Sequence, residues 1–194
     1  MIRYINVIII FTTLLLTISS CSKEEKIQEL IFVGDSHVER WDLPISFPSY
    51  ICHNYGQSGS GIEYLLSRKS ITKDKDIVVV TGRNDLSKLD GDSLQSYAKH
   101  YVRILSSLSA RNMYVFSIFP CSKKVGGVDD ADRINMVNCY IRKELLSVYP
   151  KAIYVDVYSD FMLDGELNPQ YSADGLHLNY CGYLLLSHKL LMLL

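Results

Sequence analysis

The sequence predicts one α/β domain, built as a five-stranded, mostly parallel sheet with helices on both faces. Two observations carry this prediction. Short continuous apolar runs end at turn residues, and the segments between them repeat apolar residues every three or four positions. The 194 residues hold enough apolar sequence for one such core.

Five apolar runs are typical of strands buried on both faces of a parallel sheet. The first covers residues 30–33 and stops abruptly at Gly34-Asp35-Ser36-His37. The other four lie at residues 50–55, 77–81, 113–119 and 152–157, and the first three of these are followed directly by Gly or Pro. In such sheets, chemistry gathers in the loops that follow the strands.

Helical periodicity occupies the segments between these runs. One apolar face repeats clearly at residues 94–108 and again at residues 134–148. The apolar segment 183–194 predicts a terminal helix packed against the sheet, because it is too short to cross a membrane. The alternation of strand and helix predicts crossover connections, and therefore three layers, α/β/α.

Residues 1–20 precede this domain and read as a signal peptide. Arg3 is followed by an apolar stretch over residues 5–18 and then by two serines before Cys21. This order resembles the lipobox of bacterial lipoproteins, which implies cleavage before Cys21 and lipidation of that cysteine. The apolar stretch is shorter than the roughly 20 residues that a membrane-spanning helix needs.

Residues 21–29 are expected to form the lipidated cysteine and a polar tether, with a hydrolase domain at residues 30–194. Seven extended residues reach roughly 23 Å, which would hold the domain close to a membrane. Lys23-Glu24-Glu25 also resembles an export signal of surface lipoproteins. We expect a bacterial cell-envelope protein, at the periplasmic face of the outer membrane or at the cell surface.

The charges of the chain nearly cancel, since 20 Lys and Arg residues stand against 21 Asp and Glu residues. No basic field is present that would attract nucleic acid, so no nucleic-acid partner is expected. His53, His100 and His188 lack the close spacing to cysteines or carboxylates that a metal site needs, so no metal is expected either.

The loops after the strands carry the groups that acyl transfer needs. That reaction requires a hydroxyl nucleophile, an imidazole base, a carboxylate that orients the base, and donors for the oxyanion. The loops supply, in chain order, Ser36, Gly59, Asn84, and then Asp174 with His177. Because the carboxyl ends of parallel strands share one edge, these loops are expected to converge there.

These blocks resemble the SGNH or GDSL hydrolase family, whose Ser, Gly, Asn and His occur in the same order, over about residues 30–190. The resemblance implies a flavodoxin-like three-layer fold and no cofactor. It implies a catalytic triad of Ser36, Asp174 and His177. It also implies an oxyanion hole formed by the backbone N–H groups of Ser36 and Gly59 and by the side chain of Asn84.

The residues support these assignments independently of the resemblance. Asp174 and His177 are three positions apart, so a tight turn can place both on one side and let the carboxylate accept from one imidazole nitrogen. Gly34 and Gly59 allow backbone conformations and close approaches that a Cβ would block.

The sequence departs from the family pattern at His37, where the family often has Leu, and at Arg83. Neither change removes a catalytic atom. His37 is a poor base for Ser36, because adjacent side chains in an extended segment diverge, and it is a candidate pocket residue. For Arg83 two interpretations stay open: contact with an anionic or hydroxyl-rich substrate, or an exposed solubilising role.

Other polar residues of these loops have structural interpretations. Ser58 is the rival nucleophile, since residues 56–59 nearly match the G-x-S-x-G elbow, but residue 60 is Ser rather than Gly. Asn54 is expected to satisfy the backbone at a strand end, and Asp35 and Asp85 to order their own loops.

Four cysteines follow Cys21, and in an exported chain they permit three fully paired arrangements. The spacing does not choose among them. Two of them, Cys52 and Cys139, fall in apolar patterns typical of buried free thiols, whereas Cys121 and Cys181 lie near strand ends or the predicted site.

Taken together, the sequence predicts a serine esterase that hydrolyses small acyl esters, preferably acetyl, of carbohydrates or glycans through an acyl-enzyme on Ser36. Short loops favour a small acyl group, and residues 164–179 resemble family members grouped with acetylhydrolases and carbohydrate esterases. The alternatives are a lysophospholipase or thioesterase, which a lipid anchor would favour, and an O-acetyltransferase acting on envelope polysaccharide. A glycan-binding lipoprotein is the non-enzymatic alternative.

Overall fold

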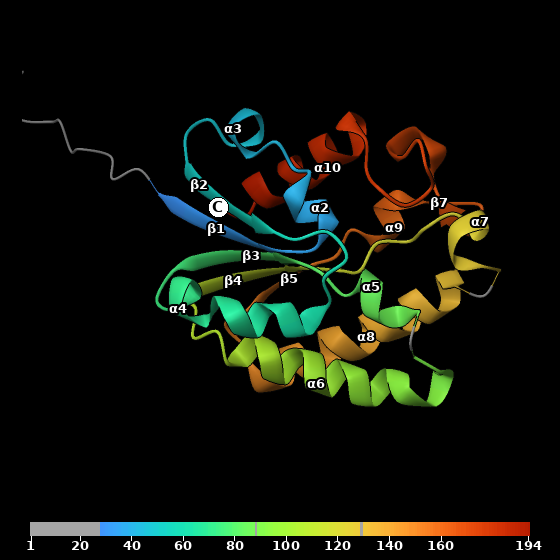
Figure 1. Cartoon of the computed structure of the whole chain (residues 1–194), viewed down its shortest axis with the longest axis horizontal. Helices are drawn as coiled ribbons and strands as arrows, with labels where there is room; N and C mark the ends of the chain where they lie inside the picture. Colours follow the sequence, from blue (N-terminus) through green and yellow to red (C-terminus); the bar gives the residue numbers. More distant parts are fainter. Residues whose placement is uncertain (1–27, 88, 129) are drawn as a thin grey trace, which may run out of the picture.

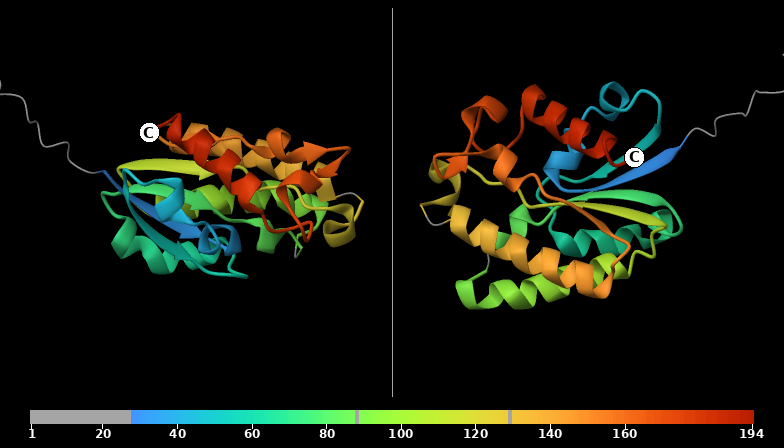
Figure 2. Two further views of the ribbon diagram at one scale, coloured as in Figure 1. Left: turned by 90° about the horizontal axis from the view of Figure 1, so that it is seen from above. Right: turned by 180° about the vertical axis from the view of Figure 1, so that it is seen from behind.

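The computed structural model of the chain describes residues 28–87, 89–128 and 130–194. The predicted signal peptide, Cys21 and most of the predicted tether lie outside the described residues. The beginning of the described chain and the C-terminus lie at the same end of the molecule (Figure 1 and Figure 2).

Five parallel strands form one sheet in the order β2-β1-β3-β4-β5 (Figure 1). They are β1 (Glu29–Gly34), β2 (Ile51–Gly56), β3 (Asp76–Val80), β4 (Asn112–Phe116) and β5 (Ile153–Val155). The predicted number of strands is confirmed, although β4 ends three residues before the predicted strand does. A separate antiparallel pair, β6 (Met162–Leu163) and β7 (Glu166–Leu167), was not predicted.

The inner strands β1 and β3 are continuously apolar because their side chains enter two hydrophobic cores, one on each face of the sheet. Successive side chains of a strand point to opposite faces, so alternate residues of β1 and β3 enter different clusters. Ile31, Val33 and Val79 enter one cluster, and Leu30, Phe32 and Val78 enter the other. All six side chains are fully buried or nearly so, which makes the sheet a rigid support for its loops.

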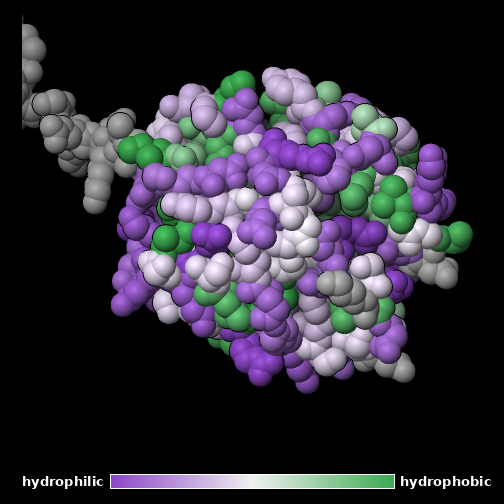
Figure 3. All heavy atoms as spheres, in the orientation of Figure 1, coloured by the Kyte–Doolittle hydropathy of each residue, from purple (hydrophilic) through white to green (hydrophobic). Residues whose placement is uncertain are grey.

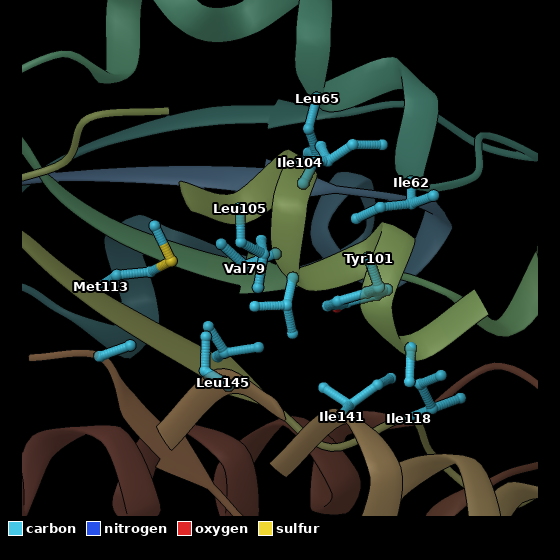
Figure 4. Packing of buried hydrophobic residues seen from close by; sticks show 14 of the residues in the cluster. Ile62, Leu65, Val79, Tyr101, Ile104, Leu105, Met113, Ile118, Ile141 and Leu145 are labelled. Carbon is cyan, nitrogen blue, oxygen red and sulfur yellow. The ribbon is translucent and has the colours of Figure 1, made fainter. Parts of the chain in front are cut away.

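Helices cover both faces of the sheet, as predicted (Figure 1 and Figure 2). The first face carries η1 (Ile62–Arg68), α6 (Leu94–Ser106) and α8 (Asp130–Val148), whose apolar residues pack against Val79 and Met113 (Figure 4). The second face carries α2 (Ser36–Glu39), α3 (Leu43–Ser46) and α10 (Tyr180–Leu191). The remaining short helices are α4 (Lys69–Thr72), α5 (Arg83–Leu86), η2 (Gly91–Ser93), α7 (Lys123–Gly126), α9 (Tyr158–Phe161) and η3 (Pro169–Tyr171).

The last helix, α10, packs against the sheet as predicted. Leu186 and Leu190 are fully buried, whereas Leu184 and Leu191 are exposed. Within the described ranges, the structure contains no helix with the length and apolar character of a membrane span. The face drawn in Figure 3 is mainly hydrophilic, with small, separate hydrophobic patches.

Candidate active site

The turn between β1 and α2 places Ser36 at the carboxyl edge of the sheet. A Cβ on Gly34 would lie 1.8 Å from the carbonyl oxygen of Val80, so glycine is needed for β1 and β3 to approach here. The backbone N–H of Asp35 donates to the same Val80 oxygen at 3.1 Å. Ser36 then begins α2 and is 7% exposed.

The loop after β2 is fastened to the end of β1. Residues 57–60 form a β-turn in which Ser60 N–H donates to the Gln57 carbonyl at 3.1 Å. Its third residue, Gly59, has φ +76°, which favours glycine. The Ser60 hydroxyl donates to the Gly34 carbonyl at 3.2 Å. The exposed Ser58 hydroxyl donates to the Glu39 carboxylate, so among the described residues the rival nucleophile has no imidazole base beside it.

The loop after β3 joins the same edge through Asn84. One hydrogen of the Asn84 amide goes to the Ser60 carbonyl at 2.9 Å, which leaves its second hydrogen for another acceptor. Asp85 is structural, as predicted, since its carboxylate accepts from the Ile62 backbone at 2.9 Å and from the Tyr97 hydroxyl at 2.8 Å. Asn54 satisfies the backbone after α2, donating to the Val38 carbonyl at 2.7 Å.

Asp174 and His177 meet in the turn before α10. Asp174 Oδ2 lies 2.8 Å from His177 Nδ1, and Asp174 Oδ1 accepts the backbone N–H groups of Leu176 and His177 at 2.9 and 2.7 Å. These hydrogen bonds, the one from the His177 ring above all, hold the pKa of Asp174 well below its usual range. The carboxylate therefore stays ionised and orients the imidazole.

The His177 ring lies beside the loop that carries Ser36. Its centroid is 5.8 Å from that of His37, the residue after Ser36. Among the described residues, no hydrogen bond joins the Ser36 hydroxyl to His177, and Nε2 of His177 has no partner. Such contacts are often loose in unliganded enzymes and tighten with substrate.

Three donors remain for an anion at this edge. Within the described ranges, the backbone N–H groups of Ser36 and Gly59 have no acceptor, and the Asn84 amide has one hydrogen left. The hydrogen bonds from Ser60 to Gly34 and from Asn84 to Ser60 hold the loops of these donors together. The arrangement can receive one negatively charged oxygen beside Ser36.

The interpretation of Arg83 as an exposed, solubilising residue was wrong. Its side chain is 14% exposed and forms an ion pair with the nearly buried Asp130 at 3.0 Å, and it also donates to the Cys121 sulfur at 3.0 Å. Burial raises the pKa of Cys121 to about 12, so this thiol is neutral. The pairing could not be predicted from local sequence, because Arg83 and Asp130 are 47 residues apart.

Sequence analysis also missed the position of His37. The ring is buried, with Nδ1 3.1 Å from Asp35 Oδ1 and Nε2 3.1 Å from the Leu176 carbonyl oxygen. The available signal for this position was the histidine itself, which stands where the family often has leucine. Asp35 caps α2 by accepting the His37 backbone N–H at 2.9 Å, which agrees with its predicted structural role.

The cysteines that follow Cys21 are unpaired with one another. Cys139 is exposed, against the prediction of a buried thiol, because its side of α8 faces solvent, and Cys52 is only partly buried. In the part of the chain that the structure describes, no three His, Cys, Asp or Glu side chains are arranged to hold a metal ion.

No family model matches this chain. It is 27% identical over 176 residues to the N-acylneuraminate cytidylyltransferase of Escherichia coli O18:K1:H7, and the match covers 86% of this chain and 40% of that protein. The chain therefore spans about two fifths of the length of this curated relative.

Three solved structures illustrate the fold similarity. A putative platelet activating factor from Streptococcus pneumonia has a TM-score of 0.73 at 25% identity, covering 89% of this chain and 86% of that one. A GDSL-like lipase from Bacteroides thetaiotaomicron has a TM-score of 0.65 at 20% identity, covering 86% and 87%. An acetylxylan esterase from Geobacillus stearothermophilus has a TM-score of 0.61 at 16% identity, covering 85% and 93%. With its four sequence blocks gathered at one edge of a parallel sheet, this chain has the fold of the SGNH/GDSL hydrolases.

Proposed function

We propose that this protein is a serine esterase that removes small acyl groups, acetyl above all, from carbohydrates or glycans. The observation that carries the proposal is the pair formed by Asp174 and His177. Its ionised carboxylate lies 2.8 Å from one imidazole nitrogen and leaves the other without a partner beside the loop of Ser36.

In the proposed reaction, the Ser36 hydroxyl attacks the ester carbonyl and His177 Nε2 takes its proton. The oxyanion accepts hydrogen bonds from the backbone N–H groups of Ser36 and Gly59 and from the Asn84 amide. His177 returns the proton to the leaving alcohol, which forms the acyl-enzyme. Water, deprotonated by His177, then releases the acid, and no cofactor takes part.

Two comparisons support a carbohydrate as the substrate. One structural neighbour is an acetylxylan esterase, and the name of the curated relative includes N-acylneuraminate, a sugar acid whose N-acyl group is an amide rather than an ester. The short loops at the carboxyl edge also favour a small acyl group in a shallow site.

Ser36→Ala tests the proposal. We expect this variant to lose the hydrolysis of p-nitrophenyl acetate while its thermal unfolding stays nearly unchanged, and Ser58→Ala to keep most of the activity. Acetylated xylan and O-acetylated sialic acids then compare the natural substrate classes. Activity retained by Ser36→Ala would reject the assigned nucleophile.

One observation favours the lysophospholipase or thioesterase alternative. A cavity of about 520 Å³ lies between α3 and α10 and includes Leu178, the residue after His177. Its apolar walls include Ile45, Leu184 and Leu191, and its volume is in the range of small-molecule sites. A longer acyl chain would find apolar contacts there.

A chain-length series decides between the two substrate classes. If the cavity holds an acyl chain, Leu184→Asp lowers kcat/KM for octanoyl esters and leaves acetyl esters unaffected. Leu193→Asp is the matched control, because Leu193 is also exposed and does not line the cavity. Equal rates for octanoyl esters in both variants would leave the small-acyl esterase as the function.

Lipidation of Cys21 belongs to the same proposal and supports a location in the cell envelope. β1 begins at the end of the sheet opposite α2 (Figure 1), so a lipidated tether would enter the domain at the edge far from Ser36. This placement favours a glycan substrate over a membrane lipid. Mass spectrometry of the protein from its native host tests it, and an unmodified Cys21 would contradict it.

A further inference from the structure

The surroundings of the His37 side chain are not explained by the proposed role of its neighbour Ser36. Its ring is nearly inaccessible, with 4% of the side chain exposed. Nδ1 lies 3.1 Å from a carboxylate oxygen of Asp35, and Nε2 lies 3.1 Å from the carbonyl oxygen of Leu176, 139 residues away. We call this contact between the two loops the His37 bridge.

Both partners of the His37 ring are hydrogen-bond acceptors. A neutral imidazole has one N–H and one lone pair, so it could satisfy only one of them and would direct its lone pair at the other. An imidazolium ion donates to both. The two distances, both within hydrogen-bond range, therefore call for a hydrogen on each ring nitrogen.

The charge balance around the ring agrees with a cation. Asp35 is 1% exposed, and a buried carboxylate needs a partner of opposite charge. The other charged groups nearby have their own partners. Arg83, which lines the same small cavity as Asp35 and His37, pairs with Asp130, and His177 pairs with Asp174.

The remaining groups that face His37 are uncharged and fix its position. Phe119 meets the ring edge-on, with centroids 5.0 Å apart. The Tyr183 hydroxyl, from α10, donates to the His37 carbonyl at 2.9 Å, and burial raises the pKa of Tyr183, so this hydroxyl stays neutral. Asp35 is thus the acid that the ring contacts.

We propose that His37 is a buried imidazolium ion that positions His177 by holding the Leu176 carbonyl to the loop of Ser36. This role rests on the proposed esterase function, because it gives the bridge a reaction to serve. Loss of the proton would set a lone pair against the Leu176 carbonyl and release the segment that carries the base. The bridge therefore depends on a hydrogen at each ring nitrogen of His37.

Two variants separate the halves of the bridge. The amide nitrogen of His37→Gln can take the place of Nε2 and donate to Leu176, whereas that of His37→Asn takes the place of Nδ1 and reaches Asp35 alone. We expect kcat to stay within about threefold for His37→Gln and to fall about tenfold or more for His37→Asn, with KM little changed, because the base is displaced.

Equal losses of kcat in the two variants would overturn the proposal. Thermal unfolding of both variants shows whether each is folded. A general structural role would lower stability in both and would not separate them by kcat.

Nitrogen NMR of the wild-type protein gives an answer that depends on neither activity nor variant folding. With ¹⁵N-labelled histidine, we expect both ring nitrogens of His37 to carry a hydrogen at neutral pH, with its signals assigned by their loss in His37→Gln. A single N–H would overturn the bridge. An inactive wild-type protein would instead refute the esterase proposal, so the two failures are distinguishable.

Discussion

Two histidine–aspartate pairs lie side by side at the carboxyl edge of the sheet, and they differ in what the second ring nitrogen meets. In the pair of Asp174 and His177, one imidazole nitrogen contacts the carboxylate and the other is unpartnered. In the pair of Asp35 and His37, both nitrogens are occupied, by the carboxylate and by a backbone carbonyl. The first ring can exchange a proton with substrate, whereas the second holds its protons in place.

The two pairs also differ in burial: the pair with the unpartnered nitrogen is the more exposed one. The His177 side chain is 20% exposed and that of Asp174 is 53% exposed, against 4% and 2% for His37 and Asp35. A base must reach solvent and substrate, and a positioning ion pair is held more firmly when water is excluded. In the proposed function, the same two residue types therefore serve catalysis in one place and architecture in the other.

The largest expected effect comes from removing the base. His177→Gln should lower kcat by about 10⁴-fold or more, because it removes the imidazole proposed to take the proton from Ser36. His37→Gln is the matched variant and should lose no more than about threefold. Steady-state kinetics with p-nitrophenyl acetate measures both, and a larger loss for His37→Gln would reverse the assigned roles.

The two aspartates should separate activity from stability. Asp174→Asn should lower kcat by roughly 10³- to 10⁴-fold, because the imidazole loses its orienting charge, while its unfolding changes little. Asp35→Asn should lower the free energy of unfolding by roughly 3 kcal/mol, because it leaves the buried His37 ring without its counter-charge. Urea denaturation and kcat are measured on both variants. A large loss of kcat in Asp35→Asn with a large loss of stability in Asp174→Asn would show that the two roles are exchanged.

Asn84→Ala tests whether the oxyanion donors act independently of either histidine. Removing the amide should lower kcat by about 10²- to 10³-fold, because one donor to the developing oxyanion is lost. The acid side of the pH profile should keep its shape, since His177 is untouched. A shifted acid limb in Asn84→Ala would show that this residue acts through the base instead.

The smallest expected effect concerns the wild-type protein, in the shape of its pH–activity profile on the acid side. The pKa of Asp174 is lowered on folding, so its ion pair is intact above the usual carboxyl range and is lost only as pH falls through the lowered value. Asp174 should therefore add no second proton to the acid decline of activity, and log kcat/KM should have a slope no steeper than one down to about pH 4. A slope of two above that pH would mean that Asp174 titrates with the base.

Much of the fold was predictable because its signals are local. The five apolar runs correspond to β1 to β5, and the periodic segments correspond to α6, α8 and α10. The short helices α2 and α3, of four residues each, were missed because one turn is too short to show a period. The hairpin of β6 and β7 has two residues per strand and gives no alternation to detect.

The candidate site was predictable in its contents and only partly in its contacts. The pairing of Asp174 with His177 follows from their spacing in one turn. The role of Arg83 did not follow, because its partner Asp130 comes from α8, on a distant part of the chain. The bridging role of His37 was missed for the same reason.

By itself, the sequence determined the strands, the main helices and the residue types presented after each strand, because these depend on periods of two to four residues and on turn chemistry. Only the tertiary structure decided which of those groups keep a hydrogen-bonding atom without a partner and which have all such atoms paired. The contact of His37 with Leu176 spans 139 residues and exists because two loops meet at one edge of a packed sheet. A contact of that kind depends on how layers pack, which no local spacing records.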